Sequence, residues 1–235
     1  MDRSCFSCGE ISSGKYCTNC GQSLAFKRIT LKGILHEAFH FFTHFDKGFP
    51  YTLKRLFTAP GKMQREYVEG NRNRYQKPFS MFFLCASMAA LGLYWINHSI
   101  VLYFNAGNGG EAAFFHQYWV LLQVCLLPLY TLLTYLFFKN TNYNYAEVGV
   151  LQLYTFAFIF FVLTMIHLLK FIWPELQTRY IELPVVIGYG VITNMRFFHK
   201  IPKWSSVIKS VLLIALTFLI ASYTQDLLVS FLSKQ

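Results

Sequence analysis

Charged residues are scarce in this sequence. Asp, Glu, Lys and Arg make up 14% of its 235 residues, whereas a soluble domain carries about a quarter. Hydrophobic residues make up 54% of the chain and aromatic residues 19%. So few charges cannot cover the surface of a water-soluble protein of this length. The composition therefore argues against an ordinary soluble domain and predicts a membrane protein.

A cleavable signal peptide is also missing. The first thirty residues contain four cysteines and several charges, but no apolar core segment of the kind that a signal peptide needs. We therefore expect the N-terminus to stay in the compartment where the chain is made.

Long apolar runs follow Pro78, and they are judged against the roughly 20 residues that a spanning helix needs. The run near residue 181 is shorter and more polar than the others, with Glu182 at one end and Asn194 and Arg196 at the other. The predicted fold class is an all-α polytopic membrane protein with about five transmembrane helices in residues 79–235. The predicted spans are about 79–97, 118–138, 148–169, 181–198 and 207–225.

Basic residues are distributed unevenly between the predicted loops. Thirteen of the 21 Lys and Arg residues lie in residues 1–79, and the loop over 98–117 contains none. Loops rich in Lys and Arg stay in the cytoplasm. Five spans with a cytoplasmic N-terminus place all but three of the 21 basic residues on the cytoplasmic side. The exceptions are Lys170, Arg179 and Lys234. This bias predicts that the C-terminus lies on the opposite side.

The formal net charge of +10 needs its own explanation. Such a charge can indicate nucleic-acid binding, but here the basic residues flank membrane spans. Topology and attraction to anionic lipid headgroups explain them, so we expect membrane lipids as partners and no nucleic acid.

Four cysteines near the N-terminus follow a metal-binding pattern in "CFSCGEISSGKYCTNCGQ". Cys5 and Cys8 form one CxxC, Cys17 and Cys20 form another, and a glycine follows each pair. Two such turns, joined by a short hairpin, are typical of a closed structural Zn²⁺ site with four thiolate ligands. The alternatives are disulfides, which a reducing cytoplasm disfavours, and a redox dithiol, which needs one CxxC in a larger fold. The pattern predicts a cytoplasmic zinc ribbon over residues 1–24.

Residues 31–49 have helical apolar periodicity and include "HEAFH", the HExxH pattern of zinc metalloproteases. Its His36, Glu37 and His40 are the candidate catalytic residues of that alternative function. The histidines, with His44, fall on the face opposite an apolar stripe, and no obvious third ligand follows at a protease spacing. We favour an interfacial amphipathic helix, whose histidines bind lipid phosphates, partner groups or adventitious metal, or form a non-catalytic metal or pH-sensing site.

The juxtamembrane stretch "FTAPGKMQREYVEGNRNRYQKPF" places cations and tyrosines at the level of the lipid headgroups, because Pro78 precedes the first span. Arginines in such a position can grip phosphate with two hydrogen bonds. An ordinary membrane anchor explains the pattern as well and is the interpretation that we favour. The candidate lipid-binding or partner-binding residues are Arg65, Tyr67, Arg72, Arg74, Tyr75 and Lys77.

The first third of the chain carries a specific series of motifs: "KYCTNCGQ", "RIT" at 28–30, His36-Glu37, "HFDKGF" at 44–49, Thr52, Leu56, Pro60-Gly61, Arg65-Glu66-Tyr67, Gly70, Arg72, Tyr75 and Pro78. In this series the chain resembles an uncharacterised family of bacterial inner-membrane proteins, the domain-of-unknown-function family 3667. The resemblance implies a bacterial inner membrane as the location but no activity.

Few polar residues lie within the predicted spans, and Gln123, Gln152, His167 and Asn194 form no acidic pair or relay with their neighbours in sequence. Internal repeats and broken helix pairs, which mark many transporters, are also missing. We therefore expect a non-enzymatic accessory or scaffold protein that binds a larger membrane protein complex or lipids, with the zinc ribbon as its docking element. A membrane metalloprotease and a small transporter are the alternatives.

Overall fold

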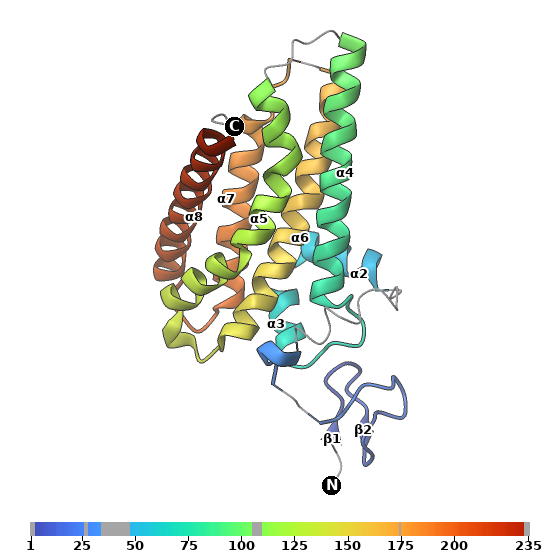
Figure 1. The fold of residues 1–235 in the computed structure, drawn as a ribbon. Helices are drawn as coiled ribbons and strands as arrows, with labels where there is room; N and C mark the ends of the chain where they lie inside the picture. Colours follow the sequence, from blue (N-terminus) through green and yellow to red (C-terminus); the bar gives the residue numbers. More distant parts are fainter. Residues whose placement is uncertain (1–2, 26–27, 34–47, 105–109, 174, 233–235) are drawn as a thin grey trace.

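The computed structural model describes residues 3–25, 28–33, 48–104, 110–173 and 175–232. The chain begins with a small ribbon in which two short strands, β1 (Arg3–Ser4) and β2 (Ile11–Ser12), pair antiparallel. We call residues 3–25 the cysteine ribbon. It lies at one end of a bundle of long helices (Figure 1).

Two short helices follow, α2 (Phe49–Thr58) and α3 (Lys62–Val68), near the same end of the bundle (Figure 1). α2 contacts α6, and α3 contacts α6 and α7. The turn between them depends on Gly61, whose φ of +76° favours glycine. A Cβ atom on Gly61 would lie 2.3 Å from the carbonyl oxygen of Thr193, so the turn packs directly on the backbone of a distant helix. The side chains of Leu56 and Met63 are fully buried in the same core.

The bundle consists of α4 (Pro78–Phe104), α5 (Gly110–Phe137), α6 (Tyr145–Leu168), α7 (Arg179–Phe197) and α8 (Lys203–Leu232). Four of these helices contain a segment that is long and apolar enough to cross a membrane. The segments are Pro78–Ile100, Trp119–Phe137, Tyr145–Phe171 and Lys203–Leu228. The predicted class, a helical membrane protein, is consistent with this finding.

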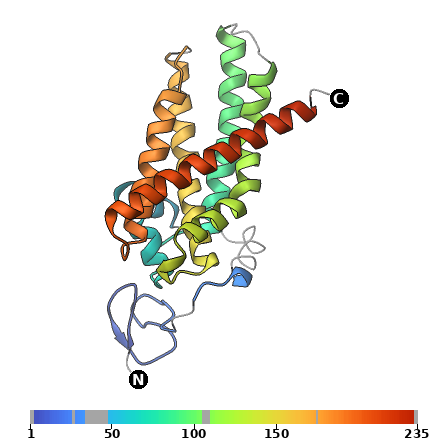
Figure 2. The same ribbon diagram turned by 90° about the vertical axis from the view of Figure 1, so that its left-hand side faces the viewer.

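α7 is the helix of the predicted fourth span, and it does not meet that criterion of length and composition. Its 19 residues include Glu182, Pro184 and Arg196. α7 packs against α6 and α8 and brings the chain back toward the ribbon end, so that α8 starts there and runs obliquely across the bundle (Figure 2). Five spans therefore stay a prediction.

α6 is the central helix of the bundle and the most deeply buried of the candidate spans. It begins with a capping box, in which the side chain of Asn144 accepts from the N–H of Glu147 and the Glu147 carboxylate accepts from the N–H of Asn144. Its neighbours α4 and α5 pack along it. By contrast, α8 is mostly exposed within the chain, as expected of a helix that faces lipid.

The predicted interfacial helix over residues 31–49 depends mainly on residues 34–47, which lie outside the described part of the chain. The same is true of His36, Glu37 and His40.

Candidate metal centre and the adjoining cavity

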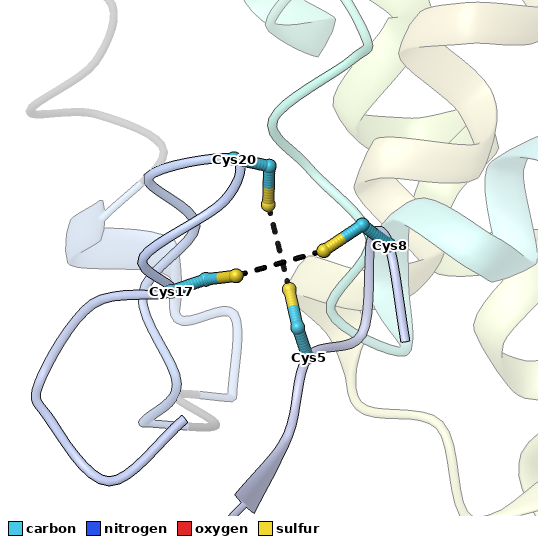
Figure 3. Close-up of side chains that lie close together, drawn as sticks. All are labelled: Cys5, Cys8, Cys17 and Cys20. Atoms are coloured by element: carbon cyan, nitrogen blue, oxygen red, sulfur yellow. Dashed lines mark hydrogen bonds between the residues drawn. The ribbon is translucent and has the colours of Figure 1, made fainter. Parts of the chain in front are cut away.

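The four N-terminal cysteines converge on one point (Figure 3). Their sulfur atoms all lie within 4.8 Å of one another. The Sγ atoms of Cys5 and Cys20 are 3.5 Å apart, as are those of Cys8 and Cys17. Each CxxC thus contributes both of its sulfurs to a single cluster, and within the described residues this is the cluster that could hold a metal ion.

Each CxxC turn has the same local structure. The N–H of Gly9 donates to the carbonyl of Cys5, and the N–H of Gly21 donates to the carbonyl of Cys17, both at 2.9 Å. The two glycines have φ values of +78° and +71°, which strain any residue with a Cβ. These turns explain why a glycine follows each pair of cysteines.

The thiols do not titrate alike. A backbone hydrogen bond from Cys20 lowers the pKa of Cys17 to about 6, whereas the pKa of Cys8 is raised to about 12 by burial and by its neighbouring thiols, despite a backbone hydrogen bond from Glu10 that lowers it. Neighbouring negative charges so close together repel one another. A cation between the sulfurs would allow all four to be thiolates at once.

The ribbon is fixed to the rest of the chain through its second CxxC turn. The side-chain oxygen of Gln22 accepts from the N–H of Asn73 at 2.9 Å, and its Nε2 donates to the carbonyl of Gly70 at 3.2 Å. The side-chain amide of Asn73 donates to the carbonyl of Cys20 at 2.5 Å. The loop after α3 is therefore tied to a metal-ligand residue.

A second connection lies just after the ribbon. The guanidinium of Arg28 donates to both carboxylate oxygens of Glu147, at 2.8 and 3.1 Å, and to the carbonyl of Asn142. The carbonyl of Ile29 accepts from the side chain of Asn144 at 3.0 Å. Glu147 is almost fully buried, so this pair joins the ribbon segment to the start of the central helix.

A cavity of about 650 Å³ lies between the ribbon and the juxtamembrane segment. Five of the six predicted lipid-binding or partner-binding residues line it: Tyr67, Arg72, Arg74, Tyr75 and Lys77. The sixth, Arg65, does not line the cavity. Its guanidinium donates to the carbonyl of Arg196 at 3.0 Å and lies 3.8 Å from the carboxylate of Glu69, so it joins α3 to α7.

Sequence reasoning missed other parts of this wall. The ribbon contributes Gly21, Gln22 and Ser23, and the start of α2 contributes Gly48 and Tyr51. Gln22 belongs to the motif "KYCTNCGQ" that carries the family resemblance. Its contact with Asn73 could not be predicted, because nothing in the sequence near either residue indicates a hydrogen bond between residues 51 positions apart.

The structure also pairs two polar residues that are distant in sequence. His167 on α6 and Glu182 on α7 lie 3.4 Å apart, measured from Nδ1 to the carboxylate. Of the two cysteines within the candidate spans, Cys85 is fully buried and Cys125 is exposed.

These features describe a mostly helical protein with four candidate membrane spans, whose N-terminal four-cysteine ribbon is joined to the helix bundle. Residues 46–89 match the model of a family described as a protein of unknown function, DUF3667. The match spans α2, α3 and the first part of α4, and it supports the family resemblance. No curated protein and no solved structure matches the chain.

Proposed function

We propose that this protein is a non-enzymatic membrane scaffold, which uses the cysteine ribbon to dock a larger membrane protein complex. The observation that carries the proposal is the attachment of the ribbon. Hydrogen bonds of Gln22 and Arg28 connect it to the loop after α3 and to the start of α6. A docking element held in this way presents one fixed surface, so a partner does not have to order it on binding.

The ribbon also carries apolar side chains that the described part of the chain leaves exposed. The side chains of Ile11 and Tyr16 are 68% and 65% exposed. A contiguous exposed apolar patch marks a protein–protein contact, and Ile11 and Tyr16 are proposed to belong to such a patch. The contact with the partner is proposed to centre on these two residues.

The metal in the ribbon is proposed to be Zn²⁺ with a structural role. With zinc–sulfur bonds of about 2.3 Å, the sulfurs of a tetrahedral site lie about 3.8 Å apart, within the range that the four cysteines span. Four thiolates leave no open position for substrate, so this site holds the fold and performs no reaction. A ribbon with so few buried residues needs the ion to fold.

Five spans in a bacterial inner membrane are proposed as the topology, with the ribbon cytoplasmic and the C-terminus periplasmic. The direction of the helices supports this count. α6 leads away from the ribbon end and α8 starts at that end (Figure 1), so the chain has to return through α7. The basic residues of the ribbon and the juxtamembrane segment support the cytoplasmic side.

The docking role is tested by purifying the full-length chain from its native host in mild detergent and identifying co-purified proteins by mass spectrometry. A double variant Ile11→Ser/Tyr16→Ser should retain its metal and lose the partner. Ser13→Ala, an exposed change on the same ribbon, is the matched control and should retain both. A wild-type chain that emerges alone would contradict the proposal.

A further inference from the structure

The cavity between the ribbon and the juxtamembrane segment is strongly basic. Among the residues that the structure describes, the lining includes Arg72, Arg74 and Lys77 and neither aspartate nor glutamate. The nearby carboxylate of Glu66 is engaged elsewhere, since it accepts from the hydroxyl of Tyr75 at 2.6 Å and from Arg55 at 3.1 Å. Three cations that face one cavity without a lining carboxylate favour an anionic occupant.

Two of these cations are available to a ligand. Arg74 and Lys77 have exposed side chains, and neither forms an ion pair with a carboxylate in the part of the chain that the structure describes. Arg72 is instead held in place, because its guanidinium donates to the carbonyl of Tyr67 at 3.2 Å and lies 5.8 Å from the centre of the Tyr67 ring. The cavity thus combines a fixed cation with two adaptable ones.

Three tyrosines, Tyr51, Tyr67 and Tyr75, line another part of the cavity. The rings of Tyr51 and Tyr75 lie 5.6 Å apart, and those of Tyr67 and Tyr75 lie 6.5 Å apart. Gly48 lets the backbone of the loop approach closely, since a Cβ on it would lie 2.9 Å from the nitrogen of Gln76. Tyr67 and Tyr75 are buried, whereas the ring of Tyr51 is 42% exposed beside the cations, which suits a ligand that is only partly charged.

The position of the cavity relative to the membrane further limits the class of ligand that it could bind. Lys77 directly precedes Pro78, the first residue of a candidate span, so the cavity lies at the level of the lipid headgroups. We propose that it binds the phosphate group of a net anionic ligand, either the headgroup of an anionic phospholipid or a free phosphate compound. The inference deepens the proposed docking role by naming a ligand at the junction of the ribbon and the bundle.

The test uses the full-length chain in detergent, with its metal bound. Native mass spectrometry and thermal unfolding are recorded with dioctanoyl phosphatidylglycerol, with dioctanoyl phosphatidylcholine and with inorganic phosphate. Arg74→Gln and Lys77→Gln each remove one cation of the cavity. Lys54→Gln removes one exposed cation of α2 that does not line it and is the matched control.

Phosphatidylglycerol should bind more tightly than phosphatidylcholine and raise the unfolding temperature. Each cavity variant should weaken this binding on the order of tenfold, as the loss of one charge-assisted hydrogen bond does, and Lys54→Gln should not. Binding of inorganic phosphate with the same dependence on Arg74 and Lys77 would assign a soluble ligand instead of a lipid. Equal affinity for both lipids, or equal loss in Lys54→Gln and the cavity variants, would overturn the inference. A chain that retains its protein partner but fails this test leaves the docking role intact.

Discussion

Gln22 in the cysteine ribbon is hydrogen-bonded to Asn73 in the loop after α3: its side-chain oxygen accepts from the N–H of Asn73. The side chain of Asn73 in turn donates to the carbonyl of Cys20. Together with the hydrogen bond from Gln22 to Gly70, three hydrogen bonds thus join the four-cysteine cluster to the loop that carries Arg72 and Arg74. Order in the ribbon and order in the basic cavity should depend on each other.

Replacing Gln22 should loosen that connection without emptying the metal site. Gln22→Ala removes both side-chain hydrogen bonds to the loop, so limited proteolysis should cut near residues 70–74 several-fold faster, while metal content stays unchanged. Gln22→Glu keeps the acceptor for Asn73 and loses the donor to Gly70, so it should fall between Ala and the wild type. Unchanged proteolysis in Gln22→Ala would show that the ribbon does not restrain the loop.

Removing two ligands should remove the metal. In Cys17→Ser/Cys20→Ser the two remaining thiols cannot hold Zn²⁺ tightly, so elemental analysis by inductively coupled plasma mass spectrometry should find metal near zero. About one zinc per chain in this variant would instead indicate a second site and favour the histidine-based alternative of residues 36–40. Cys85→Ser is the control, because Cys85 lies outside the cluster.

Metal affinity should fall steeply with acid. Zinc binds thiolates, so binding displaces the protons that the metal-free thiols carry at a given pH. With a pKa of about 12, Cys8 keeps its proton at neutral pH, whereas Cys17, with a pKa of about 6, has already lost its own. Below about pH 6 Cys17 also takes up a proton, so competition with a chromophoric chelator should show a steeper loss of zinc there than above it. The same slope on both sides of pH 6 would contradict this pKa.

A methyl group at the turn between α2 and α3 should destabilise the protein, because this turn packs against the backbone of α7. Gly61→Ala places a Cβ in a backbone conformation that favours glycine and against the carbonyl of Thr193. We expect a loss of about 3 kcal/mol or more in the free energy of unfolding, measured by denaturant titration in detergent.

Gly188→Ala is the matched control for that change. Gly188 lies within α7, and a Cβ there would meet nothing within 4 Å. Alanine is the better helix former, so this variant should be unchanged or more stable by up to about 1 kcal/mol. Similar destabilisation of both variants would mean that the contact with Thr193 is not the cause.

The two ends of the chain should lie on opposite sides of the membrane. Cysteines are introduced one at a time at exposed Ser13 in the ribbon and at exposed Ser230 in α8 of a variant without Cys125. Their labelling with a membrane-impermeant maleimide, above that of the parent variant, which retains Cys85 and the four ribbon cysteines, should differ. In intact cells only the cysteine at 230 should be labelled, and in inverted vesicles only the one at 13. Labelling of both from one side would rule out five spans.

The four-cysteine cluster and the helical class were predictable because both depend on residues that are close together in the sequence. A CxxCG turn needs only its own backbone hydrogen bonds and a glycine with positive φ, and an apolar run of about 20 residues is recognised by composition alone. The polar fourth run shows the limit of composition: α7 forms over residues 179–197, yet its sequence does not distinguish a spanning helix from one that is merely packed.

The sequence by itself determined which cysteines form the candidate metal cluster, which segments are apolar, and that basic and aromatic residues gather before the first candidate span. Only the tertiary structure decided that Gln22 contacts Asn73 and that Arg28 pairs with Glu147. It also decided that Arg65 does not line the cavity with the other basic residues but connects α3 to α7. The physical reason is range. Local turns and helices follow from neighbouring residues, whereas a cavity forms where segments about 50 residues apart are brought together by the packing of the whole bundle.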